Sequence, residues 1–109
     1  MVKDTLQLDE VFHSLADPTR RDILNRVAAQ ELSVGQLAEK YDVSFVAISK
    51  HLKVLEKARL ISKRKDGRKY MVALKPDALL AADIYLEQYR RRWQSRYEKL
   101  DSLLKEGEQ

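Results

Sequence analysis

The stretch from Val43 to Leu60 constrains this chain most, because it predicts one amphipathic helix with an unusual outer face. Ser44 is placed to cap that helix, since its hydroxyl can accept a hydrogen bond from a free backbone N–H of the first turn. Ile48, Leu52 and Leu55 then follow at i, i+4 and i+7. This spacing gives a narrow apolar stripe on one helical face.

The opposite face of this predicted helix is suited to a DNA major groove. It contains no acidic side chain, and the first acid of the stretch is Glu56. A serine hydroxyl can bond phosphates or base edges, and a lysine can bond phosphate or guanine. The residues on this face are Phe45, Val46, Ser49, Lys50 and Lys53.

A basic hairpin is predicted directly after the helix, between Ile61 and Leu74. Two β-prone runs flank Asp66-Gly67, a pair typical of a tight turn because glycine adopts positive φ without a steric penalty. The cations near the expected tip are Lys63, Arg64, Lys65, Arg68 and Lys69. A helix followed by a basic hairpin is the order of recognition helix and wing in a winged helix-turn-helix.

The positive charge of the chain is concentrated in these two elements. Residues 44–70 hold nine Lys or Arg and two acids, a net +7, whereas the whole chain carries +4 and the remainder is therefore −3. Positive charge gathered on one motif indicates a polyanionic partner, here double-stranded DNA. The alternative is a protein-interaction module whose basic face is only solvated, which accounts for the last helix but not for the hairpin.

The rest of the chain supplies supporting helices. The patterns predict helices over about 5–16, 18–30, 34–41 and 77–105, with a capping box at Ser33 and Gln36 and another at Asp4 and Gln7. Arg20 and Arg21 oppose the dipole of the second helix, and a salt bridge with a nearby aspartate is the expected compensation, with a phosphate as the alternative. We expect a single domain over residues 1–106 and a disordered tail over 107–109.

The last predicted helix is too long for one small domain to cover. Its apolar residues recur with a mean spacing of one helical turn, and a helix over 77–105 would span roughly 43 Å. A domain of this size is only about 26 Å across. A symmetric dimer through the first and last helices would cover the stripe. The expected interface residues are Leu8, Phe12, Leu86, Tyr89, Trp93, Tyr97 and Leu100.

Other classes of function find little support in the sequence. The chain has no cysteine and two histidines, so no metal site or cofactor is expected. No paired-carboxylate, serine-centred or glycine-rich phosphate motif indicates an enzyme. No apolar segment reaches the ~20 residues that span a bilayer. The pI of about 9.4 does not by itself choose between nucleic acid and an acidic membrane surface, and we expect no membrane partner. We expect a cytoplasmic, prokaryotic protein that joins the nucleoid when it is bound to DNA.

At three places the sequence resembles the ArsR-type winged-helix repressors. These places are residues 15–24 with the run LADPTRR, residues 46–55 with VAISKHLKVL, and Asp66-Gly67-Arg68 with Tyr70. The resemblance implies a dimeric repressor that reads an imperfect inverted repeat. It supports DNA contacts by Phe45, Val46, Ser49, Lys50 and Arg68. The full predicted DNA-binding set adds Ser44, Lys53, Lys63, Lys65 and Lys69.

The chain departs from that family at two places. Family members usually have glycine at the position of Arg59, so either Arg59 adopts the left-handed conformation at a cost or the helix ends differently. Metal-sensing members carry a Cys-Val-Cys box where this chain has Ser33 and Gly35, and the last helix has Asp83 but no histidine. The resemblance is therefore to the metal-free branch. A small-molecule effector bound at the dimer interface near Trp93 stays open as an alternative.

Overall fold

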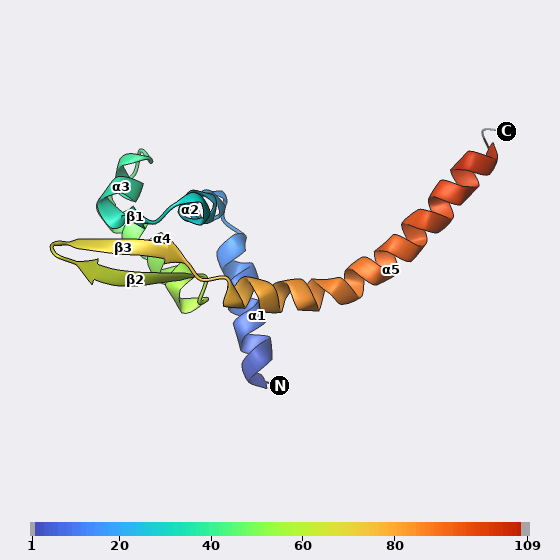
Figure 1. The fold of residues 1–109 in the computed structure, drawn as a ribbon, viewed down its shortest axis with the longest axis horizontal. Helices are drawn as coiled ribbons and strands as arrows, with labels where there is room; N and C mark the ends of the chain where they lie inside the picture. Colours follow the sequence, from blue (N-terminus) through green and yellow to red (C-terminus); the bar gives the residue numbers. More distant parts are fainter. Residues whose placement is uncertain (1, 108–109) are drawn as a thin grey trace.

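The computed structural model describes residues 2–107 and, within them, the side chains from Gln7 onward. These residues form, in chain order, α1 (Val2–Leu15), α2 (Pro18–Ala29), β1 (Leu32–Ser33), α3 (Val34–Glu39), α4 (Phe45–Lys57), β2 (Ile61–Asp66), β3 (Lys69–Leu74) and α5 (Asp77–Gly107). Figure 1 shows α2, α3, α4 and the sheet in one body, which α5 leaves as a long arm that begins beside α1. The predicted fold, mainly helical with a small hairpin, is confirmed.

Side chains hold the starts of three helices, as the sequence predicted. The carboxylate of Asp17 accepts a backbone N–H of α2 at 3.0 Å, and the hydroxyl of Ser44 accepts one of α4 at 3.1 Å. Ser33 and Gln36 form a reciprocal capping box at the start of α3, with bonds of 3.1 and 2.8 Å. These bonds satisfy N–H groups that have no partner within the helix.

The predicted capping box of Asp4 and Gln7 was wrong, because α1 begins at Val2 and both residues lie inside the helix. The Gln7 side-chain amide instead donates to the carbonyl of Ala58 at 2.7 Å. Ala58 is the C-cap of α4, so this bond fastens α1 to the end of that helix.

The hairpin is part of a three-stranded antiparallel sheet in the order β1-β3-β2. Gly67 occupies the tight turn with φ 65°, next to the Asp66–Lys69 pair that closes the ladder. The short strand β1 was not predicted. It pairs Leu32 with Val72 of β3, and two residues are too few for an alternating pattern to be visible in the sequence.

The core lies where α4 meets α1, α2, α3 and the sheet. The predicted stripe of Ile48, Leu52 and Leu55 is fully buried there. The other buried apolar residues are Val11, Ile23, Leu24, Val27, Leu32, Val34, Leu37, Ala58, Leu60, Ile61, Val72, Ala78 and Ala82. One face of α4 is therefore committed to the core, and its other face remains available for contact.

The end of α4 settles how the chain accommodates Arg59. Its φ is 61°, in the left-handed region. The backbone N–H of Arg59 donates to the carbonyl of Glu56, and that of Leu60 donates to Leu55, both at 3.0 Å. These two bonds define a Schellman cap, in which glycine is the usual left-handed residue. Arg59 therefore adopts the strained conformation, the first of the two predicted alternatives.

The arm formed by α5 is not covered by any other described part of the chain. The molecule measures 66 × 35 × 20 Å, and every residue from Gln88 to Gly107 is exposed. This confirms that one chain cannot bury the apolar stripe. Gly107 is helical, which corrects the expected start of the disordered tail, and residues 108–109 lie outside the described part. Within residues 2–107, no helix has both the length and the apolar composition needed to cross a bilayer.

Candidate nucleic-acid interface

The exposed face of α4 carries the residues that the sequence assigned to DNA. Phe45 and Val46 are 58% and 62% exposed, although both are large and apolar. Lys50 and Lys53 are also exposed, and Ser49 is half-buried. We call these five residues the reading surface. The structure thus brings them together on the side of α4 away from the core.

The wing meets the start of α4 across a groove of about 360 Å³. Phe45 of α4 and Arg68 and Lys69 of the wing line this groove. The rest of its lining includes Ser33 and the α3 residues Val34, Gly35, Gln36 and Glu39. The groove is also lined by Tyr70, which was not among the predicted DNA contacts. Tyr70 is half exposed on β3 opposite Lys65. Its signals in the sequence were its place next to the basic hairpin tip and its part in the third place of resemblance to the ArsR-type repressors.

Ion pairs within the chain separate the basic residues of residues 44–70 into two groups. Lys57 lies 3.7 Å from Glu10, and Lys63 lies 3.9 Å from Glu56. Arg64 pairs at 2.8 Å with Glu31. Among the described residues, no carboxylate lies within 4.0 Å of the remaining cations, which are Lys50, Lys53, Arg59, Lys65, Arg68 and Lys69.

This division makes Lys63 a weaker candidate for a DNA contact than the unpaired cations. Its side chain is partly buried against α4, and its charge is partly balanced. Successive residues of a strand point to opposite faces. The side chain of Arg64 therefore lies on the opposite face of the strand from Lys63 and Lys65, as the alternation predicts. Its pairing with Glu31 could not be foreseen from the sequence. Most of the unpaired charge lies on the reading surface and the wing tip.

A cluster of polar side chains fixes the turn that leads into α4. The hydroxyl of Tyr41 donates to the Asp22 carboxylate at 2.5 Å, and Arg26 donates to the same oxygen at 2.9 Å. These hydrogen bonds, that of Tyr41 first, lower the pKa of Asp22. Burial, together with the bond to Asp22, raises the pKa of Tyr41 to about 12. The cluster ties α2 to the segment between α3 and α4.

Arg20 and Arg21 lie at the positive end of the α2 dipole, and they bind backbone carbonyls in place of the salt bridges that the sequence predicted. Arg20 donates to the carbonyls of Ser14 at 2.7 Å and His13 at 3.0 Å, and Arg21 donates to that of Leu15 at 2.8 Å. These carbonyls belong to the last turn of α1, which lacks partners within its own helix. The two arginines therefore join the end of α1 to the start of α2.

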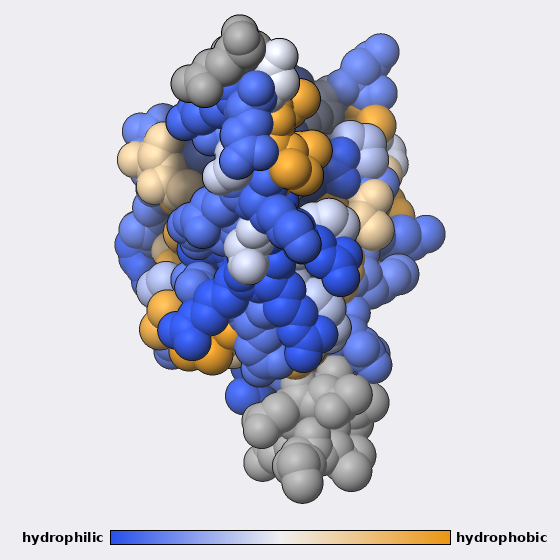
Figure 2. Space-filling view, turned by 90° about the vertical axis from the view of Figure 1, so that its right-hand side faces the viewer, coloured by the Kyte–Doolittle hydropathy of each residue, from blue (hydrophilic) through white to orange (hydrophobic). Residues whose placement is uncertain are grey.

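A second exposed surface, apolar in character, runs along α5. Trp93 is 52% exposed, and the other predicted interface residues on α5 are similarly open: Leu86, Tyr89, Tyr97 and Leu100. On α1, Leu8 packs partly against the core, and Phe12 contacts the ring of Tyr85. Figure 2, which faces the end of the arm, shows apolar patches breaking a largely hydrophilic surface.

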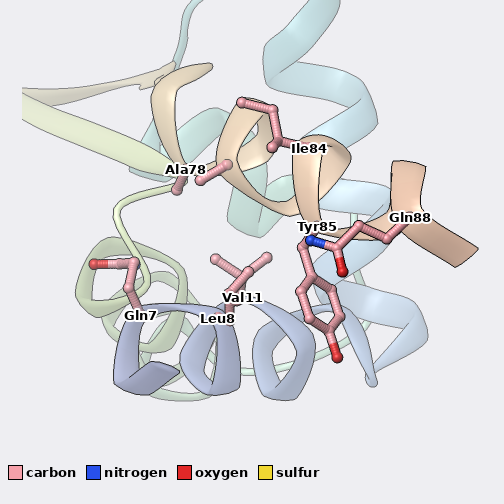
Figure 3. A pocket seen from close by; sticks show the side chains of 8 residues that line it. Gln7, Leu8, Val11, Ala78, Ile84, Tyr85 and Gln88 are labelled. Carbon is pink, nitrogen blue, oxygen red and sulfur yellow. The ribbon is translucent and has the colours of Figure 1, made fainter. Parts of the chain in front are cut away.

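Two apolar residues missing from the predicted interface lie on another side of α5. Leu80 and Ile84 are 61% and 63% exposed. Ile84 borders a groove of about 390 Å³ between α1 and α5, where Leu8 and Val11 face Ala78 and Tyr85 (Figure 3). Their i, i+4 spacing was visible in the sequence. They lay off the main stripe, so the stripe alone did not select them.

No cluster of metal ligands competes with these two surfaces in the part of the chain whose side chains are described. No three His, Cys, Asp or Glu side chains come together there in a way that could hold a metal ion. The hydroxyl of Ser33, at the position of a thiol in metal-sensing members, is occupied in capping α3.

Comparison with known proteins agrees with this geometry. The model of the family "Bacterial regulatory protein, arsR family" matches residues 17–63. The HTH-type transcriptional regulator Rv2034 of Mycobacterium tuberculosis is 40% identical over 92 residues, which are 84% of this chain and 86% of that protein. The transcriptional repressor SdpR of Bacillus subtilis is 36% identical over 61 residues, 56% of this chain and 68% of that protein.

Solved structures extend the similarity to the whole fold. The crystal structure of the ArsR family transcriptional regulator RHA00566 superposes with a TM-score of 0.77 at 32% identity, covering 84% of this chain and 94% of that one. Regulators of this family bind DNA and usually dimerise. The matched segment, residues 17–63, contains the capped helices α2, α3 and α4. The chain therefore belongs to the ArsR family of bacterial transcriptional regulators.

Proposed function

We propose that this chain represses transcription as a homodimer that binds an imperfect inverted repeat in double-stranded DNA. The observation that carries the proposal is one groove that is lined both by Phe45, at the start of the reading surface, and by Arg68 and Lys69 of the wing. The repressor SdpR, to which the chain is similar, supports the sign of the regulation. Location in the cytoplasm remains a prediction.

The two parts of the site would have different tasks. α4 would enter the major groove, where Ser49 and Lys50 reach base edges, because each base pair presents a distinct set of donors and acceptors there. The wing, with Lys65 and Arg68, would contact the backbone or the minor groove, which gives affinity with little dependence on sequence.

Dimerisation would use α1 and the apolar side of α5. The support for this is the set of exposed apolar residues on α5, which no described part of the chain covers. The groove between α1 and α5 extends this apolar surface to Ile84. We therefore add Ile84 to the proposed interface residues. We propose no metal-dependent release from DNA, because the chain contains no cysteine.

The proposal is tested by selecting the bound sequence from genomic DNA and then comparing four alanine variants. Ser49→Ala and Lys50→Ala should weaken binding to the selected operator more than binding to random DNA. Lys65→Ala and Arg68→Ala should weaken both to a similar extent, because phosphate contacts carry no base information. Equal losses in all four variants would show that the reading surface is assigned wrongly.

The salt dependence of binding gives a second test. If each subunit neutralises roughly three to five phosphates, affinity should fall about 10³- to 10⁵-fold between 50 and 200 mM salt. A protein-interaction module with a solvated basic face would show no selected operator and no such slope.

A further inference from the structure

Arg20 binds three acceptors at once and thereby reaches the helix that carries the reading surface. Its Nε and Nη2 donate to the carbonyls of Ser14 and His13 at the end of α1. Its Nη1 lies 3.4 Å from Nδ1 of His51 in α4. The two carbonyls hold the guanidinium in place, and the backbone N–H of Arg20 is separately bonded to the carboxylate of Asp17. Arg20 therefore sits at the junction of α1, α2 and α4.

This contact fixes where the proton of the imidazole lies. A guanidinium has only donors, so Nδ1 of His51 must be the acceptor in its bond with Arg20. A neutral imidazole with an accepting Nδ1 carries its proton on Nε2. The one carboxylate near the ring, that of Asp17, lies 3.8 Å from Nδ1, too far to take a proton from Nδ1 in a hydrogen bond.

The Nε2–H group is then left as an outward donor. Among the described residues it has no hydrogen-bond partner, and no buried polar side-chain atom lacks a partner, so Nε2 reaches solvent. His51 directly follows Lys50 of the reading surface, about 100° around the helix from it. A donor beside the surface that enters the major groove lies where the phosphates lining that groove pass.

We propose that His51 donates from Nε2 to a phosphate of the DNA backbone and that Arg20 is the positioning residue that sets this tautomer. The inference rests on the proposed function, because it needs DNA against α4. The bonds of Arg20 to α1 would then also connect α1 to the DNA contact of α4. A single side chain ties the end of a proposed dimerisation helix to a DNA contact.

The tautomer can be measured without DNA. His13→Gln leaves His51 as the sole imidazole, because the chain has two histidines. Nitrogen-15 chemical shifts at pH 8, where imidazoles are ordinarily neutral, should then show the Nε2–H form. Adding Arg20→Lys should give a mixture of both tautomers, because lysine cannot span the carbonyls and the ring together. A dominant Nδ1–H form in the protein with Arg20 intact would overturn the proposal.

The phosphate contact is tested with three substitutions of His51. Glutamine can place an amide N–H near the position of Nε2, whereas asparagine places one near Nδ1 and alanine has none. His51→Gln should keep most of the affinity, and His51→Asn and His51→Ala should lose about tenfold per subunit, the effect of one hydrogen bond to a charged group. The loss should be equal on operator and random DNA.

Two readouts separate this contact from a structural role and from a charged one. The slope of affinity against salt should be unchanged in His51→Ala at pH 8, because a neutral donor releases no counterion. Equal affinities of the glutamine and asparagine variants, with equal melting temperatures, would overturn the contact. If the wild type itself binds no DNA, the proposed function fails and this contact fails with it. If the wild type binds and His51→Ala binds as tightly, only the contact is overturned.

Discussion

Replacing Arg59 by glycine should stabilise the protein, although it removes a side chain at the end of the helix that carries the reading surface. Arg59 has φ 61° in the Schellman cap of α4. In this conformation the Cβ of an L-residue lies too close to the following carbonyl oxygen. Glycine has no Cβ and keeps both cap bonds, which are made by backbone atoms. The folded state therefore loses strain and no hydrogen bond of the cap.

The expected gain follows from two opposing terms. The left-handed conformation costs an L-residue about 1–2 kcal/mol. The greater freedom of glycine in the unfolded chain offsets about 0.5–1 kcal/mol of the relief. The net increase in the free energy of unfolding should be roughly 0.5–1 kcal/mol, which for a domain of this size raises Tm by about 2–6 °C.

Arg59→Ala is the matched control, because it removes the guanidinium but keeps the Cβ. Urea denaturation and thermal melts of the three proteins should be run at one protein concentration, since association adds to the stability of a dimer. Arg59→Gly should exceed both the wild type and Arg59→Ala. A neutral or destabilised glycine variant, or an equal gain in the alanine variant, would refute the strain at this cap.

Four further predictions concern the dimer, metals and, in two cases, pH. Trp93→Ala should weaken operator binding by up to about 10²- to 10⁴-fold at low protein concentration, because two linked DNA-binding subunits bind far better than one. Sedimentation should show monomers at concentrations where the wild type is dimeric. A variant that remains dimeric with full affinity would remove Trp93 from the interface. Zn²⁺, Cd²⁺, Ni²⁺ and arsenite should leave operator affinity unchanged, as titration of the complex would reveal, and stoichiometric binding with release of DNA would contradict this. The pKa of Asp22 is lowered in the folded state, so its contribution to stability is present above about pH 4 and is lost as pH falls; Asp22→Asn should be less stable than the wild type at pH 7, and this difference should shrink in acid. The pKa of Tyr41 is raised to about 12, so its contribution is present below pH ~10 and is lost as pH rises toward 12; a stability difference between wild type and Tyr41→Phe that did not narrow over that range would contradict the Tyr41–Asp22 bond.

The sequence by itself determined the local elements and the polarity of α4. Ser33, Ser44 and Asp17 cap helices through atoms no more than three residues away. Gly67 closes the hairpin within its own turn. Patterns of this kind depend on interactions between near neighbours in the chain, so they are present before any tertiary contact forms. The length of α5 against the size of the domain likewise showed that its apolar stripe exceeds what one chain can cover.

Only the tertiary structure decided which distant partner each remaining polar side chain bonds. Arg20 had two nearby aspartates as candidates, yet it binds carbonyls of α1 and the ring of His51. Gln7 was a plausible cap and instead reaches Ala58, 51 positions away. The strand β1 exists because β3 passes beside two residues that carry no strand pattern of their own. A flexible donor has many acceptors within its reach in the unfolded chain, and only the packing of helices α1, α2 and α4 leaves it with one set.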